Sequence, residues 1–586
     1  MTDQNRRLYM LLGAALLLIV IGGLLAWNTQ TAGGSIQIRD VRFMGTNGTL
    51  MSGLLYIPPG VTAENKAPGV LAVHGYINSR ETQAGFAIEF ARRGYVVLAL
   101  DQTGHGYSDP PAFANGFGGP DGLRYLRSLD LVDPDNIAME GHSMGGWASA
   151  IAAGVYPEDY RSILLVGSST GTFGAPDGTP EFPRNLGLIF SEWDEFSQLM
   201  WGAPVAKDIV STDKLKTLFN TTETVEVGKL YGSIEDGTAR KLYMPRTTHP
   251  GDHLSNEAIG NAIEWLQLTL TGGNGLDPND QVWYWKEIGS FIAFIGMVLF
   301  FFPFGALLLQ TPFFSELAEP MPEARAAAGG GWWLAAALTA FIPVITFYWL
   351  QHRGNELFPN GSFWPQNITT GILVWVVGNA LIALVLFLVW HYQVNRKAGA
   401  TINHYGFTWD GRLNWRKIVK SLLLALCIAA GAYVLLLLAG AIFLIDFRLW
   451  VLALKPMSPL HFQIFLAYLI PFAFFFLVSS MAINSQLRRQ QASLGLSMVI
   501  NGLVLCVGII VLLLIQYIPL LSGSPLPLEE SLLTIVAFQF VPLLFIAGLV
   551  ATYFFHKTGR IYVGAFLNAL FITAYIVAGQ AIQFAF

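Results

Sequence analysis

The residues best suited to chemistry in this sequence surround Ser143, in the stretch NIAMEGHSMGGWAS at 136–149. A short apolar run leads into a Gly-x-Ser-x-Gly box, and small residues follow it. This order is typical of a nucleophile elbow, in which a buried strand ends, the chain turns sharply at a serine, and a helix begins. Gly141, Gly145 and Gly146 lack the Cβ that would obstruct so tight a turn. The stretch therefore predicts a serine nucleophile.

A serine hydroxyl is a weak nucleophile at neutral pH, so it needs a histidine base, a carboxylate to hold that base, and donors for an oxyanion. The elements that could position these groups lie between about residues 35 and 271, where short β-rich runs alternate with amphipathic segments. Continuous Val/Leu/Ile runs separated by helices indicate a mostly parallel sheet that is covered on both faces. The expected strands are 38–44, 50–57, 69–75, 95–101, 136–141, 162–167, 185–190 and 240–244. A last helix is expected at 258–270, after an N-cap at Ser255.

Three stretches resemble α/β-hydrolases, especially the dienelactone hydrolase, esterase and serine aminopeptidase branches. LRSLDLVDPDNIAMEGHSMGG at 126–146 is similar to the strand and elbow of that family. VLAVHGY at 70–76 resembles the HG turn after the third strand, and LALDQTGHGYSD at 98–109 resembles the D-x-x-GHGxSD segment after the fourth. The resemblance covers about residues 35 to 272 and implies an α/β-hydrolase fold, a doubly wound and mostly parallel sheet of about eight strands.

In this family the catalytic residues follow the order Ser, Asp or Glu, His. PRNLGLIFSEWDEFSQLM at 183–200 has the form of a strand and a turn, which puts Asp194 about where the family's acid lies. Glu195 is a weaker candidate beside it. Asp236 competes because it is nearer to the histidines, but it lies in what looks like a hairpin turn.

The family's histidine lies in the loop before the last helix, where TTHPGDHLSNEAIGNAIEWL supplies His249 and His253. We favour His253, because PGDHLS directly before the Ser255 cap is closer to the family pattern, and we keep His249 as the alternative. The resemblance also implies that the N–H groups of Tyr76 and Met144 form the oxyanion hole. It implies no metal and no organic cofactor.

Composition shows that much of the chain must lie in lipid. Its 586 residues are 53% hydrophobic and only 12% charged, with a mean hydropathy of +0.48. A net charge of −5, without a Lys/Arg-rich run, argues against a nucleic-acid partner. Cys427 and Cys506 both lie in apolar runs, so neither a disulfide framework nor thiol chemistry is indicated.

The apolar runs divide the chain into four parts. Residues 1–34 form an N-terminal transmembrane anchor, 35–272 the α/β-hydrolase domain, 273–287 a linker, and 288–586 a membrane domain of about eight helices. Each long run is sufficient to cross about 30 Å of hydrocarbon. The expected spans of the last part are 288–309, 331–350, 368–392, 418–445, 460–483, 494–518, 530–555 and 561–585.

Basic residues give the orientation. With a cytoplasmic N-terminus, the inside loops contain Arg6, Arg7, Arg325, Arg396, Lys397, Arg412, Arg416, Lys417, Arg488, Arg489, Lys557 and Arg560. The short outside loops contain only Arg353, Arg448 and Lys455. Under the positive-inside rule this places the α/β domain outside the cytoplasm, in a multi-pass protein of the cell membrane with about nine spans.

Polar residues within the spans are mostly amides, namely Asn379, Asn501, Gln539 and Asn568. Such groups more often join helices than carry ions, which disfavours proton-driven transport. The sequence therefore predicts a membrane-integrated serine hydrolase that acts on an ester-like or lipid-like acyl substrate. The alternatives are a peptidase of the serine aminopeptidase type, and a transporter or sensor whose outer domain binds without cutting. The oligomeric state stays open.

Overall fold

The computed structural model describes residues 3–324, 329–397, 399–448, 451, 453–489 and 492–586, and the chain divides into two compact units. The sheet unit comprises Leu24–Gly289, Gln516–Ser531 and Gly579–Phe586. The helical unit comprises Met1–Gly23, Ser290–Ile515 and Leu532–Ala578. Two short segments from late in the sequence thus belong to the sheet unit. Arg325, one of the basic residues expected in an inside loop, lies outside the described residues.

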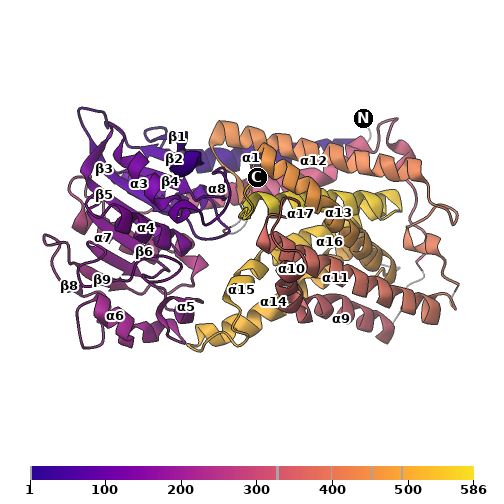
Figure 1. Cartoon of the computed structure of the whole chain (residues 1–586). Coiled ribbons are helices and arrows are strands. Elements are labelled where there is room, and N and C mark those ends of the chain that lie inside the picture. The colour runs from indigo at the N-terminus through magenta and orange to yellow at the C-terminus, as the bar shows by residue number, and fades with distance from the viewer. Residues whose placement is uncertain (1–2, 325–328, 398, 449–450, 452, 490–491) are drawn as a thin grey trace. The chain divides into compact units, whose positions relative to one another are not determined.

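The sheet has nine strands in the order β1-β2-β4-β3-β5-β6-β7-β9-β8 (Figure 1). They are β1 (Gln37–Met44), β2 (Leu50–Ile57), β3 (Ala67–Val73), β4 (Val96–Asp101), β5 (Val132–His142), β6 (Ser162–Val166), β7 (Leu186–Ile189), β8 (Leu230–Tyr231) and β9 (Arg240–Tyr243). From β4 to β9 all neighbours are parallel, while β1, β2 and β8 pair antiparallel. The prediction of a mostly parallel sheet is confirmed, and the added strand β8 is only two residues long.

Helices cover both faces of the sheet because successive side chains of a strand point to opposite sides. Val70 and Ala72 of β3 pack in one core with α2 (Ala84–Arg92) and α7 (Asn256–Thr269). The intervening Leu71 and Val73 pack in the other core, with α3 (Gly119–Arg127) and α4 (Met144–Val155). Burial on both faces explains why these strands are continuously apolar in the sequence.

The expected N-cap of α7 is also confirmed, since the Ser255 side chain accepts a hydrogen bond from the Ala258 N–H at 3.2 Å. Two short helices lie in the loops that carry candidate site residues. They are α5 (Ser197–Trp201), in the loop after β7, and a 3₁₀ helix, η5 (Pro250–Leu254), in the loop after β9.

Long apolar helices dominate the rest of the chain. They are α1 (Asp3–Gln30), α8 (Tyr284–Leu308), α9 (Gly330–Ile345), α10 (Phe347–Leu357), α11 (Asn367–Trp390), α12 (Trp415–Phe443), α13 (Pro459–Met481), α14 (Leu494–Leu521), α15 (Ser531–Phe538), α16 (Phe540–Thr558) and α17 (Tyr562–Gly579). Among the described residues, eight helical segments are long and apolar enough to cross a membrane, and the pair α9 and α10, bent by 51°, would make a ninth. This number is compatible with a multi-pass membrane protein.

Amides within the helical unit mostly link helices, as expected. Asn379 of α11 donates to Thr346 at 2.9 Å, Asn501 of α14 to Thr552 of α16 at 2.8 Å, and Asn568 of α17 to Ala547 of α16 at 2.8 Å. Gln539, at the break between α15 and α16, is buried, and its side-chain amide makes no hydrogen bond to the described residues.

Candidate active site

Ser143 stands at the apex of the turn between β5 and α4. Its backbone has φ 54° and ψ −121°, a conformation that L-residues rarely adopt and that persists only where the surrounding structure enforces it. A Cβ on Gly145 would collide with the Val73 carbonyl of β3, and one on Gly141 would collide with the Gly145 carbonyl. Glycine at these two positions therefore allows α4 to begin directly against the sheet. Ser143 itself is partly exposed while its neighbours in the turn are buried.

Hydrogen bonds to β6 and the loop after it fix this turn. The Ser143 N–H donates to the Val166 carbonyl at 2.8 Å, and Ser168 Oγ donates to the Ser143 carbonyl at 2.7 Å. Both backbone polar groups of Ser143 are thus satisfied by one neighbouring segment. The side chain remains the polar part of Ser143 that is available for reaction.

Asp194 and His249 meet beside the carboxyl ends of β7 and β9. His249 Nδ1 lies 2.8 Å from Asp194 Oδ2, and both side chains are buried. The two strands are parallel, and their pairing continues past their ends, because the Glu192 N–H donates to Pro245 at 2.9 Å and the Trp193 N–H donates to Thr247 at 3.1 Å. The register between the two loops therefore brings the carboxylate to the imidazole.

His249 and the Ser143 turn contact the same short stretch at the end of β6. Gly167, with φ 52°, directly follows Val166, the residue that accepts the Ser143 N–H. A Cβ on Gly167 would lie 2.9 Å from His249 Nδ1 and 3.2 Å from Asp252 Oδ2. The His249 imidazole therefore packs on the residue next to Val166, which holds the Ser143 N–H.

The structure places the other two candidates elsewhere. His253 lies in η5, with its ring 4.1 Å from that of His142 and 6.1 Å from that of Phe86. Asp236 lies in an exposed turn before β9, at the opposite end of that strand from His249. Of the two histidines left open by the sequence, His249 is the one that pairs with Asp194.

The HG turn after β3 lies against the elbow, as an oxyanion hole requires. A Cβ on Gly75 would be 3.1 Å from Ser143 Cβ. Tyr76 follows at once, and Met144 is the first residue of α4, whose N–H has no partner within the helix. Ile77 has φ 60°, which is costly for a β-branched residue and shows that the turn is held firmly.

Histidines near the site act as supports. His74 Nδ1–H donates to the Gly75 carbonyl at 2.6 Å, while His74 Nε2 accepts the Gln102 N–H at 3.1 Å, so this ring ties the HG turn to the loop after β4. His142 Nε2–H donates to the His249 carbonyl at 2.8 Å. His142, the residue just before Ser143, thus holds the backbone of His249, which pairs with Asp194.

Charges at the site alter its titration. Burial alone would lower the pKa of His249, but the charge and hydrogen bond of Asp194, together with the charge of Glu195, raise it. Burial and the neighbouring Asp194 raise the pKa of Glu195 to about 7. Burial also raises the pKa of Asp252, which accepts a hydrogen bond from Ser191 Oγ. A buried imidazole that is hydrogen-bonded to a carboxylate suits the transfer of a proton.

Several contacts of the site could not be read from the sequence. Glu195 accepts the His249 N–H at 2.8 Å and the Tyr517 hydroxyl at 2.5 Å. Gln583 Nε2 donates to the Tyr76 hydroxyl at 2.8 Å. The adjacent acidic residues Asp194 and Glu195 can be recognised in the sequence as site candidates. Tyr517, which bonds to Glu195, cannot, because it lies far along the chain in an apolar run.

Residues 68–197 match the family described as alpha/beta hydrolase fold. The sheet unit has the α/β-hydrolase fold. This confirms the fold implied by the motifs, and it indicates a hydrolase. No curated protein matches this chain.

Solved structures similar to this chain include three hydrolases. One is an esterase from Pyrococcus furiosus, with 16% identity, 41% of this chain and 94% of that chain covered, and a TM-score of 0.30. Another is a dienelactone hydrolase-like promiscuous phosphotriesterase from metagenomic libraries, with 14% identity, 40% and 98% coverage, and a TM-score of 0.29. The third is the thioesterase domain from the curacin biosynthetic pathway, with 14% identity, 40% and 100% coverage, and a TM-score of 0.27.

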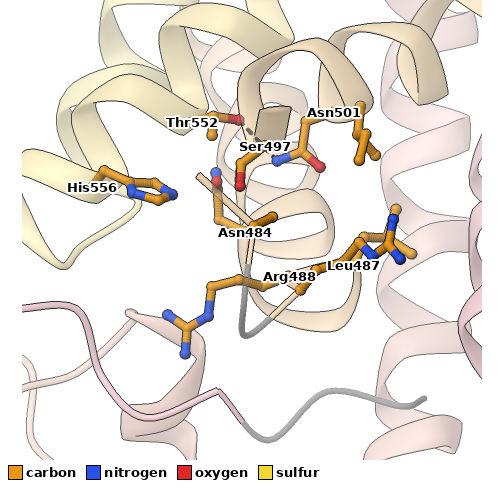
Figure 2. A pocket seen from close by; sticks show the side chains of 10 residues that line it. Asn484, Leu487, Arg488, Ser497, Asn501, Thr552 and His556 are labelled. Carbon is orange, nitrogen blue, oxygen red and sulfur yellow. Dashed lines mark hydrogen bonds between the residues drawn. The ribbon is translucent and has the colours of Figure 1, made fainter. Parts of the chain in front are cut away.

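The helical unit contains a polar hollow of a different kind (Figure 2). Asn484, Arg488, Asn501, Thr552 and His556 are among its lining residues. Its free volume is about 10 Å³, which is room for about one water molecule. Such a space cannot hold an acyl substrate.

Proposed function

We propose that this protein is a membrane-integrated serine hydrolase that cleaves an ester-like or lipid-like acyl substrate. The observation that carries the proposal is the buried pair of His249 Nδ1 and Asp194 Oδ2, 2.8 Å apart, which packs on the same end of β6 as the Ser143 elbow. We assign Ser143 as nucleophile, His249 as base and Asp194 as the acid that orients it. Met144 and Tyr76 supply the N–H groups of the oxyanion hole.

The reaction follows from these roles. With its Nδ1–H donated to Asp194, the neutral His249 keeps Nε2 free to take the proton of the Ser143 hydroxyl. The Ser143 Oγ then attacks the acyl carbon, and the two backbone N–H groups stabilise the oxyanion, each lowering the barrier by about 3 kcal/mol. His249 returns the proton to the leaving group as the bond breaks, and an acyl-enzyme remains. Water then attacks the acyl carbon as His249 takes its proton, and His249 passes that proton to Ser143 Oγ as the bond from carbon to Oγ breaks, which releases the carboxylic acid and restores Ser143.

Membrane attachment supports the choice of substrate. The α/β-hydrolase fold is continuous in the chain with helices that are long and apolar enough to cross a bilayer. A site held at a membrane meets acylated and lipid substrates at high local concentration. The distribution of Lys and Arg supports a cytoplasmic N-terminus and a sheet unit outside the cytoplasm.

A fluorophosphonate probe tests the chemistry directly, because it labels activated serines. The full-length wild-type protein in detergent should be labelled, and Ser143→Ala should not. Hydrolysis of p-nitrophenyl esters of graded chain length, compared with aminoacyl p-nitroanilides, then separates an esterase from a peptidase. A folded wild-type protein that resists the probe would support a binding domain instead.

The location has its own test. Asp236 is exposed in a turn of the sheet unit, so Asp236→Cys, in a background with Cys427 and Cys506 replaced by serine, should react with a membrane-impermeant maleimide on intact cells. Arg412→Cys, in a predicted inside loop, is the matched control and should react only after permeabilisation. The reverse pattern would place the sheet unit in the cytoplasm.

A further inference from the structure

The turn that carries Asp194 is held by more than its histidine. Asp194 Oδ1 accepts the Phe196 N–H at 2.7 Å, and the Phe196 ring lies 4.6 Å from the His249 ring. Between these residues, Glu195 Oε2 accepts the backbone N–H of His249 at 2.8 Å. The acid pairs with the imidazole, and its neighbour pairs with the backbone of the same histidine. Two adjacent carboxylates thus hold one residue at two points.

Glu195 is held in turn by the segment Gln516–Ser531, which belongs to the sheet unit. The Tyr517 hydroxyl donates to Glu195 Oε1 at 2.5 Å. Ser531 Oγ donates to the Glu195 carbonyl at 2.5 Å. Glu195 and Tyr517 are both buried. One bond fixes the side chain of Glu195 and the other fixes its backbone, so a single segment restrains both parts of this residue.

These bonds matter because loops by themselves do not hold catalytic groups accurately. Positional errors of about 1 Å can cost roughly 10²-fold in rate. Asp194 and His249 both lie in loops beyond the ends of their strands, just past the backbone hydrogen bond from Trp193 to Thr247. A buried carboxylate also needs hydrogen-bond donors, and Tyr517 supplies one that is directed by a long helix.

We propose that Tyr517 and Ser531 are positioning residues for the catalytic base, acting through Glu195 on the backbone of His249 and on the turn of Asp194. This role rests on the proposed function, because it concerns the same base. Tyr517 and Ser531 do not touch the reacting atoms in this scheme. Tyr517 lies near the end of α14, one of the segments apolar enough to cross a membrane. The geometry of the base is therefore set in part by a residue of a candidate membrane helix.

The test uses the full-length protein in detergent, with p-nitrophenyl acetate as substrate and fluorophosphonate labelling to count active serines. Tyr517→Phe should lower kcat per labelled serine about tenfold and change KM less than about twofold, since positioning affects the transition state more than binding. Ser531→Ala should lower kcat about threefold. Tyr231→Phe makes the same chemical change in β8, where the hydroxyl accepts the Glu226 N–H, and it should leave kcat unchanged.

Substitutions of Glu195 distinguish positioning from simple support of the fold. Glu195→Ala removes both side-chain bonds and should lower kcat more than Tyr517→Phe does. Glu195→Gln keeps an oxygen for the His249 N–H and an amide that can donate to the Tyr517 oxygen, so it should restore most of kcat. Normal kcat per labelled serine in Tyr517→Phe, Ser531→Ala and Glu195→Ala, even with a lower melting temperature, would overturn the positioning role.

The outcome also separates the two proposals. A wild-type protein without labelling or turnover would remove the serine hydrolase function, and the positioning role with it. A wild-type protein that is labelled and active, with unchanged kcat in all three variants, would leave the hydrolase intact and remove only the positioning role.

Discussion

The site in the sheet unit and the polar hollow in the helical unit contain similar residues but differ in what surrounds them. In the hollow, Asn501 donates to Thr552 at 2.8 Å (Figure 2). Asn484, which also lines it, donates to the Ser480 carbonyl at 3.0 Å. These bonds lie between helices or within one helix. In the sheet unit, by contrast, the polar side chains hold backbone groups of loops at the carboxyl ends of parallel strands. The bonds of the hollow hold helices together, whereas the bonds of the sheet unit fix the positions of loop residues such as His249.

The comparison shows that residue type alone does not identify an active site. His556 lines the hollow with serine and asparagine nearby, and only about 10 Å³ of free volume is available there. His249 has a carboxylate at 2.8 Å and packs beside a strained serine turn. The second site is distinguished by a histidine paired with a carboxylate and by a partly exposed serine with a strained backbone. The predictions below test this distinction in order of decreasing effect.

Loss of the nucleophile should have the largest effect. Ser143→Ala should lower kcat by about 10⁴-fold or more, since the triad acts as a unit and only oxyanion stabilisation would remain. The measurement is ester turnover by full-length wild-type protein and variant, compared after thermal unfolding has shown that the two are equally stable. Ser497→Ala, in the hollow of the helical unit, is the control and should retain normal turnover. Near-normal turnover by Ser143→Ala would rule out this serine.

Substitution of His249 should lower kcat much more than substitution of His253. His249→Ala should lower kcat by about 10³-fold or more, because it removes the group that accepts the serine proton. His253→Ala should lower kcat less than about tenfold, since its ring packs on those of His142 and Phe86. Turnover and fluorophosphonate labelling rates measure both. The opposite order would return the role of base to His253.

Removing the charge of Asp194 should shift the pH dependence of the reaction. The base must be neutral to act, so kcat/KM falls as the pH drops below the pKa of His249, which Asp194 raises. Asp194→Asn should therefore move this acid limb to lower pH by about one unit or more, as well as reduce the rate. The pH profile of kcat/KM is the measurement. An unmoved limb would show that another group titrates there.

The smallest effect should come from the helical unit. Asn501→Ala removes the bond to Thr552 and should lower the free energy of unfolding by about 1 kcal/mol, as is typical for hydrogen bonds between membrane helices. It should leave kcat unchanged. Thermal unfolding followed in detergent, together with ester turnover, gives both numbers. A loss of turnover in folded Asn501→Ala would mean that the hollow contributes to catalysis.

Much of the fold was predictable because its signals are local. The glycines beside Ser143 and the apolar runs of the strands depend on steric and burial rules that act over a few residues. β8 was not predicted, because a strand of two residues is too short to show an alternation of apolar and polar residues. The assignment of residues 516–531 and 579–586 to the sheet unit was not predicted, because it depends on tertiary contacts between distant parts of the chain.

The site was harder to predict where it depends on register. His249 and His253 lie four residues apart in one loop, and both precede the Ser255 cap. What separates them is the pairing of the loop after β7 with the loop after β9, in which Trp193 bonds to Thr247. That offset is set by the packing of the whole sheet. The sequence could therefore supply the candidates but not the choice between them.

The segment Gly579–Phe586 has a consequence for the order of biosynthesis. Ile582 exchanges backbone hydrogen bonds with Gly104 and Ala112 at 2.8 and 2.7 Å, and Gln583 bonds to Tyr76. A ribosome makes these residues after all of the long helices. The loop that carries Tyr76 therefore receives these supports only when the helices before residue 579 have been synthesised, so its support is completed after synthesis of the sheet and not during it.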